Sequence, residues 1–305
     1  MSQRQLPSSG TGSGHRGQAS PAKSHAMFAL MGLVGSIYVL LIAGWCAIVG
    51  TLPMGLVLFF VHDPSYYPLY LLAAWLSAPG LAALFAIFRD QPSLASWNAA
   101  LRQQLAVEKT QGWQLPEWIA PPYVNPDDTN ALIRPYFRAW WHLAWRSWLL
   151  ALPFGLVAFA CIYNAQIAGV LGWGSLAMPI ALVLLALLLQ ASLIALILLV
   201  EYPKAHWWPT LKNALILSVR RIYMLPISLL ALAGYGWGMT QSPILVSLLA
   251  TGISWYVIWA SARWQANKLF VQMAQESGDK RIVDMYGGKQ QHSGSTLSSL
   301  KDVQQ

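Results

Sequence analysis

The sequence predicts an all-α fold: a polytopic bundle of about six transmembrane helices with cytoplasmic amphipathic helices at the membrane interface. Three observations predict it. Only 10% of the 305 residues are charged, whereas a soluble domain carries about 25%, so polar groups cannot cover a globular surface. Apolar runs recur along the chain, several of them near the length of about 20 residues that crosses a bilayer. The basic residues lie between these runs.

Six apolar runs predict the spans of a membrane domain at residues 27–265. Their approximate bounds are 28–49, 66–88, 149–170, 176–200, 222–237 and 244–264. The first run continues to residue 61, which is too long for one perpendicular span. Its second part, with Pro53, is therefore expected to extend the span at a tilt or to lie at the interface. Pro79 and Gly80 are expected to kink the second span.

Polar segments flank and interrupt this domain. Residues 1–26 are rich in Ser, Gly, Pro and Gln, which predicts a disordered cytoplasmic tail. Residues 266–305 begin as helix and then predict a second, largely disordered tail. The connection at 89–138 contains an amphipathic helical pattern at Ser93–Lys109, followed by a stretch too rich in proline for a helix, which predicts an extended loop.

The distribution of basic residues predicts the orientation of the chain. All 19 Lys and Arg residues fall in the two tails, the second-to-third connection and the fourth-to-fifth connection, and the other connections contain none. Cytoplasmic segments carry an excess of Lys and Arg. We therefore expect a bacterial inner-membrane protein with both termini in the cytoplasm. The same bias explains the net charge of +8 without a nucleic-acid partner.

Residues 134–148 predict a basic and aromatic helix at the membrane surface. Arg134, Arg138, His142 and Arg146 recur at four-residue spacing and form one helical stripe, while Trp and Phe occupy much of the remaining surface. Trp favours the interface because its ring is apolar and its N–H needs a polar partner. Arg pairs with lipid phosphate. We expect these arginines to contact anionic headgroups or a cytoplasmic partner.

Residues 209–226 repeat this pattern weakly: a proline, a basic residue three positions later, and a second proline before the next span. Lys212, Arg220 and Arg221 are therefore expected to make the same kind of contact. Internal repeats are common in transporters. Anionic headgroups, however, select this composition at any cytoplasmic helix start, so both explanations stand.

Few polar side chains suggest chemistry. The spans carry almost no ionisable residue, which argues against a proton- or sodium-driven carrier built from this chain alone. Gln190, in the middle of a span, favours an interhelical hydrogen bond over substrate binding. Glu201 is explained by the end of a helix at the interface. Asp127 and Asp128 fit a turn and a helix N-cap better than a metal site, because no further acidic pair lies nearby.

Cofactor and catalytic motifs are missing from the sequence. Cys46 and Cys161 each lie in an apolar run, far apart, and indicate neither a disulfide nor a zinc site. There is no Walker loop, no GxGxxG and no Ser/His/Asp set with suitable spacing. We therefore expect no cofactor and no enzymatic activity.

The segment YPKAHWWPTLKNALILSVRRIYMLPISLL at 202–230 resembles the YesL-like family of bacterial integral membrane proteins of unknown function. The family pattern is a Tyr-Pro at the end of a span, a basic amphipathic helix similar to LKNALILSVRR, and another span. PGLAAL at 79–84 and YFRAW at 136–140 are similar to its proline turn and its basic-aromatic entry to a span. The resemblance covers about residues 30–265, and the insertion at 89–133 departs from it.

Members of this family often accompany genes for carbohydrate uptake. The resemblance therefore implies a non-enzymatic accessory of solute transport, with transporter subunits as partners. Two alternatives stay open. One is a self-sufficient oligomeric permease or channel, with Gln190 and Ser192 lining a path. The other is a membrane-embedded lipid-modifying enzyme that uses the 89–133 loop.

Overall fold

The computed structural model describes residues 21–110, 119–124 and 131–287. Every regular element in these ranges is a helix, which confirms the all-α class. The α-helices are α1 (Pro21–Gly50), α2 (Leu52–Phe60), α3 (Tyr67–Asp90), α4 (Pro92–Thr110), α5 (Ile133–Val170), α6 (Gly174–Glu201), α7 (Trp207–Arg220), α8 (Leu225–Gln241), α9 (Pro243–Leu249), α10 (Thr251–Glu276) and α11 (Lys280–Gly287). Short 3-10 turns, η1 (Pro64–Tyr66) and η3 (Ile222–Met224), precede α3 and α8.

Five helical segments in the described residues are long and apolar enough to cross a membrane. They are Gly32–Gly50, Tyr67–Asp90, Ile133–Val170, Leu176–Glu201 and Ile222–Gln241. A sixth span results if α9 and α10, which meet at a bend of 56°, count as one broken helix. The chain is thus a multi-pass membrane protein, in agreement with the prediction of about six spans.

The predicted third span is only part of a longer helix. α5 has 38 residues and includes both the basic aromatic segment and the apolar run that follows. At 1.5 Å per residue it is about 57 Å long, whereas the hydrocarbon core is about 30 Å thick. The helix must therefore project from the hydrocarbon, and Pro153 inside it does not end it. Near the N-terminus, the apolar residues after Gly50 form a separate helix, α2.

The predicted C-terminal tail starts too early. α10 continues past residue 265 to Glu276, and α11 packs against α10 and α4. α11 buries Ile282, Met285 and Tyr286, because its apolar residues lie on one face. This part of the predicted tail therefore belongs to the bundle, and 288–305 lie outside the described residues. At the other end α1 begins at Pro21, and the rest of the predicted first tail is likewise outside them.

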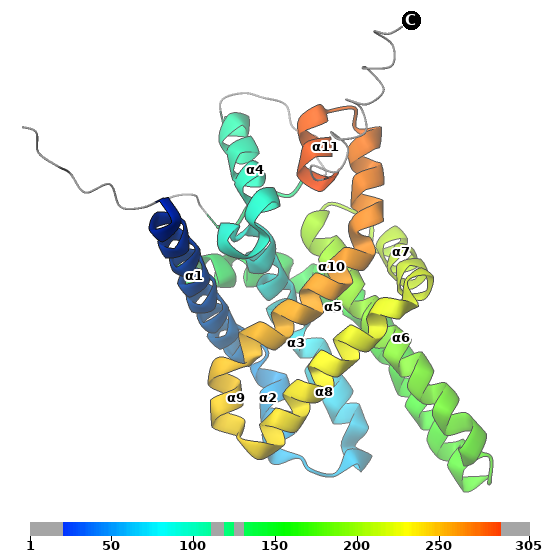
Figure 1. Cartoon of the computed structure of the whole chain (residues 1–305). Helices are drawn as coiled ribbons and strands as arrows, with labels where there is room; N and C mark the ends of the chain where they lie inside the picture. Colours follow the sequence, from blue (N-terminus) through cyan, green and yellow to red (C-terminus); the bar gives the residue numbers. More distant parts are fainter. Residues whose placement is uncertain (1–20, 111–118, 125–130, 288–305) are drawn as a thin grey trace, which may run out of the picture.

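The tightest packing lies toward one end of the bundle. Every residue of α3 from Ala82 to Asp90, and every residue of α6 from Leu193 to Glu201, is buried. The second half of α5 and the first half of α6 form an exposed hairpin instead, which extends away from the other helices at the lower right of Figure 1. α4, α11 and the end of α10 gather at the opposite end.

Glycines allow two close helix crossings in this core. Gly80 of α3 lies against Gly50 of α1, and a Cβ at Gly80 would overlap the backbone of Gly50. Tyr136 of α5 reaches the same point, where its hydroxyl donates a hydrogen bond of 3.0 Å to the Gly80 carbonyl oxygen. Gly44 of α1 and Gly252 of α10 form the second crossing. Small residues suit such contacts because helix backbones in lipid associate by close packing.

Candidate functional site

Charged side chains from four helices meet at the packed end of the bundle and form a buried ionic network, which comprises Arg89, Asp90, Arg102, Glu201 and Arg263. The first two residues end α3, Arg102 lies on α4, Glu201 ends α6 and Arg263 lies on α10. The side chain of Arg263 is 12% exposed, and each of the others is at most 1% exposed. The network therefore lies in the interior, where an unpaired charge is strongly unfavourable.

Glu201 is the anion on which three helices converge. Its Oε2 accepts hydrogen bonds from Nη2 of Arg102 at 2.8 Å and from the hydroxyl of Tyr286 at 3.0 Å. Its Oε1 accepts a third hydrogen bond from Arg263. Because Tyr286 belongs to α11, this carboxylate joins α4, α10 and α11 to the end of α6. Several donors to one carboxylate are what allow a charge to remain buried.

Arg89 and Asp90 form the second part of the network. Nε and Nη2 of Arg89 donate to the two carboxylate oxygens of Asp90 at 2.6 and 2.9 Å. Nη1 of Arg89 donates to the carbonyl oxygen of Val200 at 2.5 Å, which satisfies a backbone acceptor in the last turn of α6. The backbone N–H of Tyr123 donates to Asp90 at 2.7 Å. The connection after α4 is thus held against the ends of α3 and α6.

The network is suited to hold helices together and not to transfer protons. Burial lowers the pKa of the Arg102 guanidinium, but the charge of Glu201, with Tyr286 and Asp90, outweighs burial and holds that pKa above its usual value. Burial raises the pKa of the Tyr286 hydroxyl, so it stays protonated and can donate to Glu201. An arginine side chain does not lose its proton in proteins, and the carboxylates already accept several hydrogen bonds.

Sequence reasoning missed this network. It assigned Arg89 to a polar connection and explained Glu201 as the end of a helix at the interface, whereas both are buried and paired. One signal was available: Arg89, Asp90, Glu201 and Arg263 stand at the ends of three predicted spans on the same side of the membrane. Whether they meet depends on how the spans pack, and hydropathy does not contain that information.

The predicted arginine stripe forms an exposed face on α5, here called the basic face: Arg134, Arg138, Trp141, Trp145 and Arg146. All five are exposed, the two tryptophans by 78% and 74%. The opposite side of this part of α5 is buried, mainly against α3. The basic face lies at the same end of the bundle as the ionic network, because Tyr123 also contacts His142 of α5, at 3.5 Å.

In the second predicted basic segment, residues 209–226, two of the basic residues are exposed and one contacts another helix. Lys212 and Arg220 are exposed on α7. Arg221 is engaged within the chain: it donates to the carbonyl oxygen of Trp264 at 2.6 Å, and its guanidinium lies 4.9 Å from the centre of the Trp264 ring. Arg221 therefore ties the end of α7 to α10, and a further contact with a headgroup or partner stays a prediction for this residue.

Gln190 and Ser192, the residues expected on the path of an oligomeric permease, do not face the same side of α6. Gln190 is 1% exposed on α6, and its amide nitrogen has no hydrogen-bond partner among the described residues, so the expected interhelical bond is not formed by that atom. Ser192 faces nearly the opposite side of the helix and donates to the carbonyl oxygen of Leu189 at 2.7 Å. Asp127 and Asp128 lie outside the described residues.

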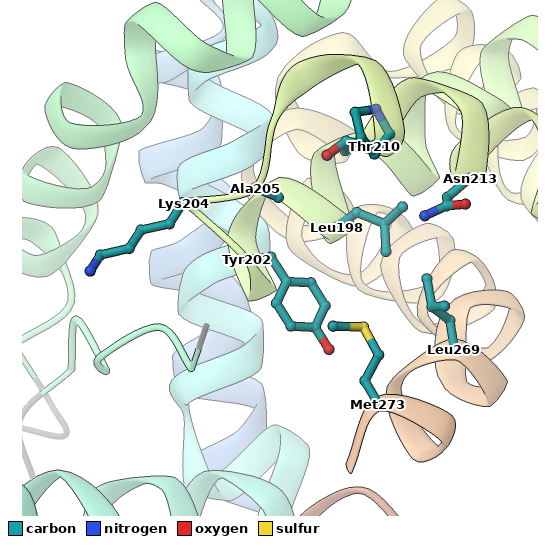
Figure 2. Close-up of a pocket in the computed structure, with 9 residues that line it drawn as sticks. Leu198, Tyr202, Lys204, Ala205, Thr210, Asn213, Leu269 and Met273 are labelled. Carbon is teal, nitrogen blue, oxygen red and sulfur yellow. The ribbon is translucent and has the colours of Figure 1, made fainter. Parts of the chain in front are cut away.

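A hollow of about 430 Å³ lies where the end of α6, the start of α7 and the second half of α10 meet (Figure 2). Its lining consists of Leu198, Tyr202, Lys204, Ala205, Pro209, Thr210, Asn213, Leu269 and Met273. In Figure 2 the side chain of Met273 lies beside the ring of Tyr202, Leu198 and Leu269 lie further along the same hollow, and Lys204 points away. This volume lies within the range of about 300–1,000 Å³ that small-molecule sites occupy.

Comparison with known proteins finds no matching family model, no matching curated protein and no matching solved structure. In the described residues, no group of three or more His, Cys, Asp and Glu side chains is placed to hold a metal ion. Among the described residues, the ionic network, the basic face and the hollow are therefore the features that bear on function.

Proposed function

We propose that this chain is a non-enzymatic component of the bacterial inner membrane that assists solute transport by binding a transporter subunit on its cytoplasmic side. Carbohydrate is the solute class that the resemblance to the YesL-like family implies. The observation that carries the proposal is the attachment of α4 and α11, together called the cap, to the ends of the spans by the ionic network. A cap that is firmly attached to the spans in this way is suited to binding a transporter subunit.

The contacts of the cap couple its position to that of the membrane spans. Glu201 at the end of α6 binds both Arg102 of α4 and Tyr286 of α11. At the outer edge of the cap, Arg281 of α11 pairs with Glu108 of α4 at 2.9 Å. A subunit bound to the cap would be held at a fixed distance from the spans. Moving α4 would separate Arg102 from Glu201 and leave buried charges unpaired, and moving α11 would break the hydrogen bond from Tyr286 to that carboxylate.

The basic face supports the proposed orientation. Its arginines and tryptophans are exposed along the part of α5 that leads into an apolar span. Anionic lipids of the cytoplasmic leaflet attract such basic segments by about 1 kcal/mol for each Lys or Arg near the surface. We therefore assign Arg134, Arg138 and Arg146 to anionic headgroups, and the cap at the same end to the cytoplasm.

Affinity purification of the tagged chain from native membranes, with mass spectrometry of bound proteins, tests the docking role. Transport subunits are expected in stoichiometric amounts. Reversing two exposed charges near the cap, Lys268→Glu with Lys280→Glu, should reduce their recovery. Gln241→Glu, which adds one negative charge at the exposed end of α8, should leave it unchanged. Protein that purifies without partners, and that alone carries solute across liposomes, would replace the accessory role with a permease.

A further inference from the structure

We propose that the hollow between α6, α7 and α10 binds one acyl chain of an anionic membrane phospholipid. This site differs from the basic face and does not depend on the transport role. Three features support it: the chemistry of the lining, the outer surface of α7 and the position of Arg220.

The lining of the hollow suits a hydrocarbon chain. Leu198, Leu269 and Met273 form apolar walls, and the lining contains no carboxylate. Thr210 adds little polarity, because its hydroxyl already donates to the carbonyl oxygen of His206 at 2.9 Å. A ligand that fills this space must therefore be largely apolar, since a polar group placed there would lose its hydrogen bonds to water.

This poverty of polar partners favours an acyl chain over a peptide. Each residue of an inserted peptide would bring a backbone N–H and a C=O that need partners. Among the lining side chains, Asn213 is a half-buried amide at the edge of the hollow, and Lys204 points away from it (Figure 2). A few polar groups at an edge can hold the polar end of an amphiphile, but they cannot satisfy a polypeptide backbone.

The outer surface of α7 places the hollow beside lipid. Trp208, Ile216 and Val219 are 60%, 50% and 61% exposed. These residues lie along most of the length of α7, and a helix that exposes such large apolar side chains in a chain with several spans is typical of the membrane interface. An acyl chain can therefore reach the hollow from the bilayer without crossing water.

Arg220 provides the site for the headgroup. It is exposed and follows Asn213 by seven residues, so both lie on one stripe of α7, about 10 Å apart along the axis. The stripe runs from the edge of the hollow toward the start of α8. A lipid whose chain occupies the hollow can lay its phosphate along this stripe, where a guanidinium binds phosphate by paired hydrogen bonds.

Photo-methionine tests the proposal because two methionines serve as probe and control. Met273 lines the hollow, whereas Met178 is 55% exposed on the protruding half of α6. The full chain is labelled with photo-methionine, incorporated in nanodiscs of phosphatidylglycerol, extracted into detergent and irradiated. Peptide mass spectrometry then identifies what is attached at each position. We expect a phosphatidylglycerol adduct at Met273. At Met178 we expect a detergent adduct, because detergent replaces the loosely bound lipid around this exposed residue during extraction.

Three variants, one of them compared in two lipids, test whether the adduct depends on the hollow and on Arg220. Leu269→Trp fills the hollow and should lower the lipid adduct at Met273 about tenfold, a loss that corresponds to about 1.4 kcal/mol. Ile216→Trp adds the same ring on the exposed side of α7 and should leave the adduct unchanged, which also controls for folding. Arg220→Gln should lower the adduct of phosphatidylglycerol more than that of phosphatidylcholine.

Three outcomes overturn the proposal. The first is a detergent adduct at Met273 equal to that at Met178, which would show that no lipid is retained. The second is a cross-link from Met273 to a peptide of this chain or of another protein, which would identify a polypeptide as the occupant. The third is an adduct of free fatty acid at Met273 in place of phospholipid, which would show that the hollow does not select a phospholipid, because a guanidinium also pairs with a carboxylate.

Discussion

The two halves of α6 have similar apolar compositions but different surroundings. In the first half, Leu182 and Val183 are 61% and 57% exposed, whereas in the second half Ile194 and Ile197 are 0% and 1% exposed. The first half packs mainly against α5, and the second half lies in the core that α3, α7 and α10 share. In a membrane, the exposed half loses little by this arrangement, because lipid chains are as apolar as leucine.

The difference shows which contacts determine how the helices of this bundle pair. The buried half of α6 ends in the ionic network, so the charged end of the helix is also the tightly packed end. Hydrophobicity alone does not draw helices together in lipid. Close glycine crossings and paired charges select which surfaces meet, and three pairs of substitutions test this difference between the packed and the exposed regions.

The largest effect is expected from Glu201→Ala. The change leaves Arg102 and Arg263 buried without their shared carboxylate, and breaking a buried ion pair from one side costs about 3–5 kcal/mol. Chemical unfolding in detergent, followed by circular dichroism, measures the loss. Glu108→Ala removes an ion pair whose side chains are 37% and 39% exposed and should cost at most about 1 kcal/mol. Equal effects of the two changes would contradict a structural role for the network.

A smaller effect is expected at the glycine crossings. Gly252→Ala places a Cβ against the backbone oxygen of Leu40, which cannot rotate away, so α1 and α10 must separate. Overpacking of this kind costs about 1–3 kcal/mol. Gly236→Ala on α8 is the control, since a Cβ there meets no atom within 4 Å, and it should stabilise the helix by up to about 1 kcal/mol. Thermal stability in detergent separates them, and a tolerated Gly252→Ala would argue against this crossing.

The smallest effect compares the two halves of α6 directly. Ile197→Ala opens a cavity in the packed half and should cost about 1–2 kcal/mol, less than in many soluble cores, because an apolar side chain is also stable in lipid. Leu182→Ala on the exposed half should change the stability little, because lipid fills the space. Paired unfolding curves in the same detergent give the difference. A larger loss at Leu182 would indicate that another protein surface covers this half.

Local patterns predicted much of the fold. The helix at Ser93–Lys109 and the stripe of arginines on α5 follow from periodicity, which depends on neighbours in the sequence. For the apolar residues after Gly50 the sequence left a tilted extension and an interfacial piece open, and the structure shows a separate helix, α2. The continuous helix through residues 133–170 was divided in the prediction, because a change from basic to apolar composition resembles a boundary. The helical backbone bonds do not depend on that change.

Among the candidate site residues, too, features of a single helix could be predicted from the sequence, whereas contacts between helices could not. The exposure of Arg134, Arg138 and Arg146 follows from the sequence because an exposed stripe is a property of one helix, and their contact with headgroups or a partner stays a prediction. The contact between Arg221 and Trp264 could not be predicted in this way, because Trp264 lies on another helix.

By itself, the sequence determined that the chain is helical and crosses a membrane several times, because hydropathy, helix periodicity and the placement of charges act along the chain. The tertiary structure alone decided which apolar surfaces form the core, that Arg102, Glu201 and Arg263 neutralise one another, and that a hollow forms between α6, α7 and α10. The physical reason is that lipid accepts any apolar surface equally. The choice among helix pairings therefore depends on close backbone contacts and on charge pairs between residues far apart in the sequence.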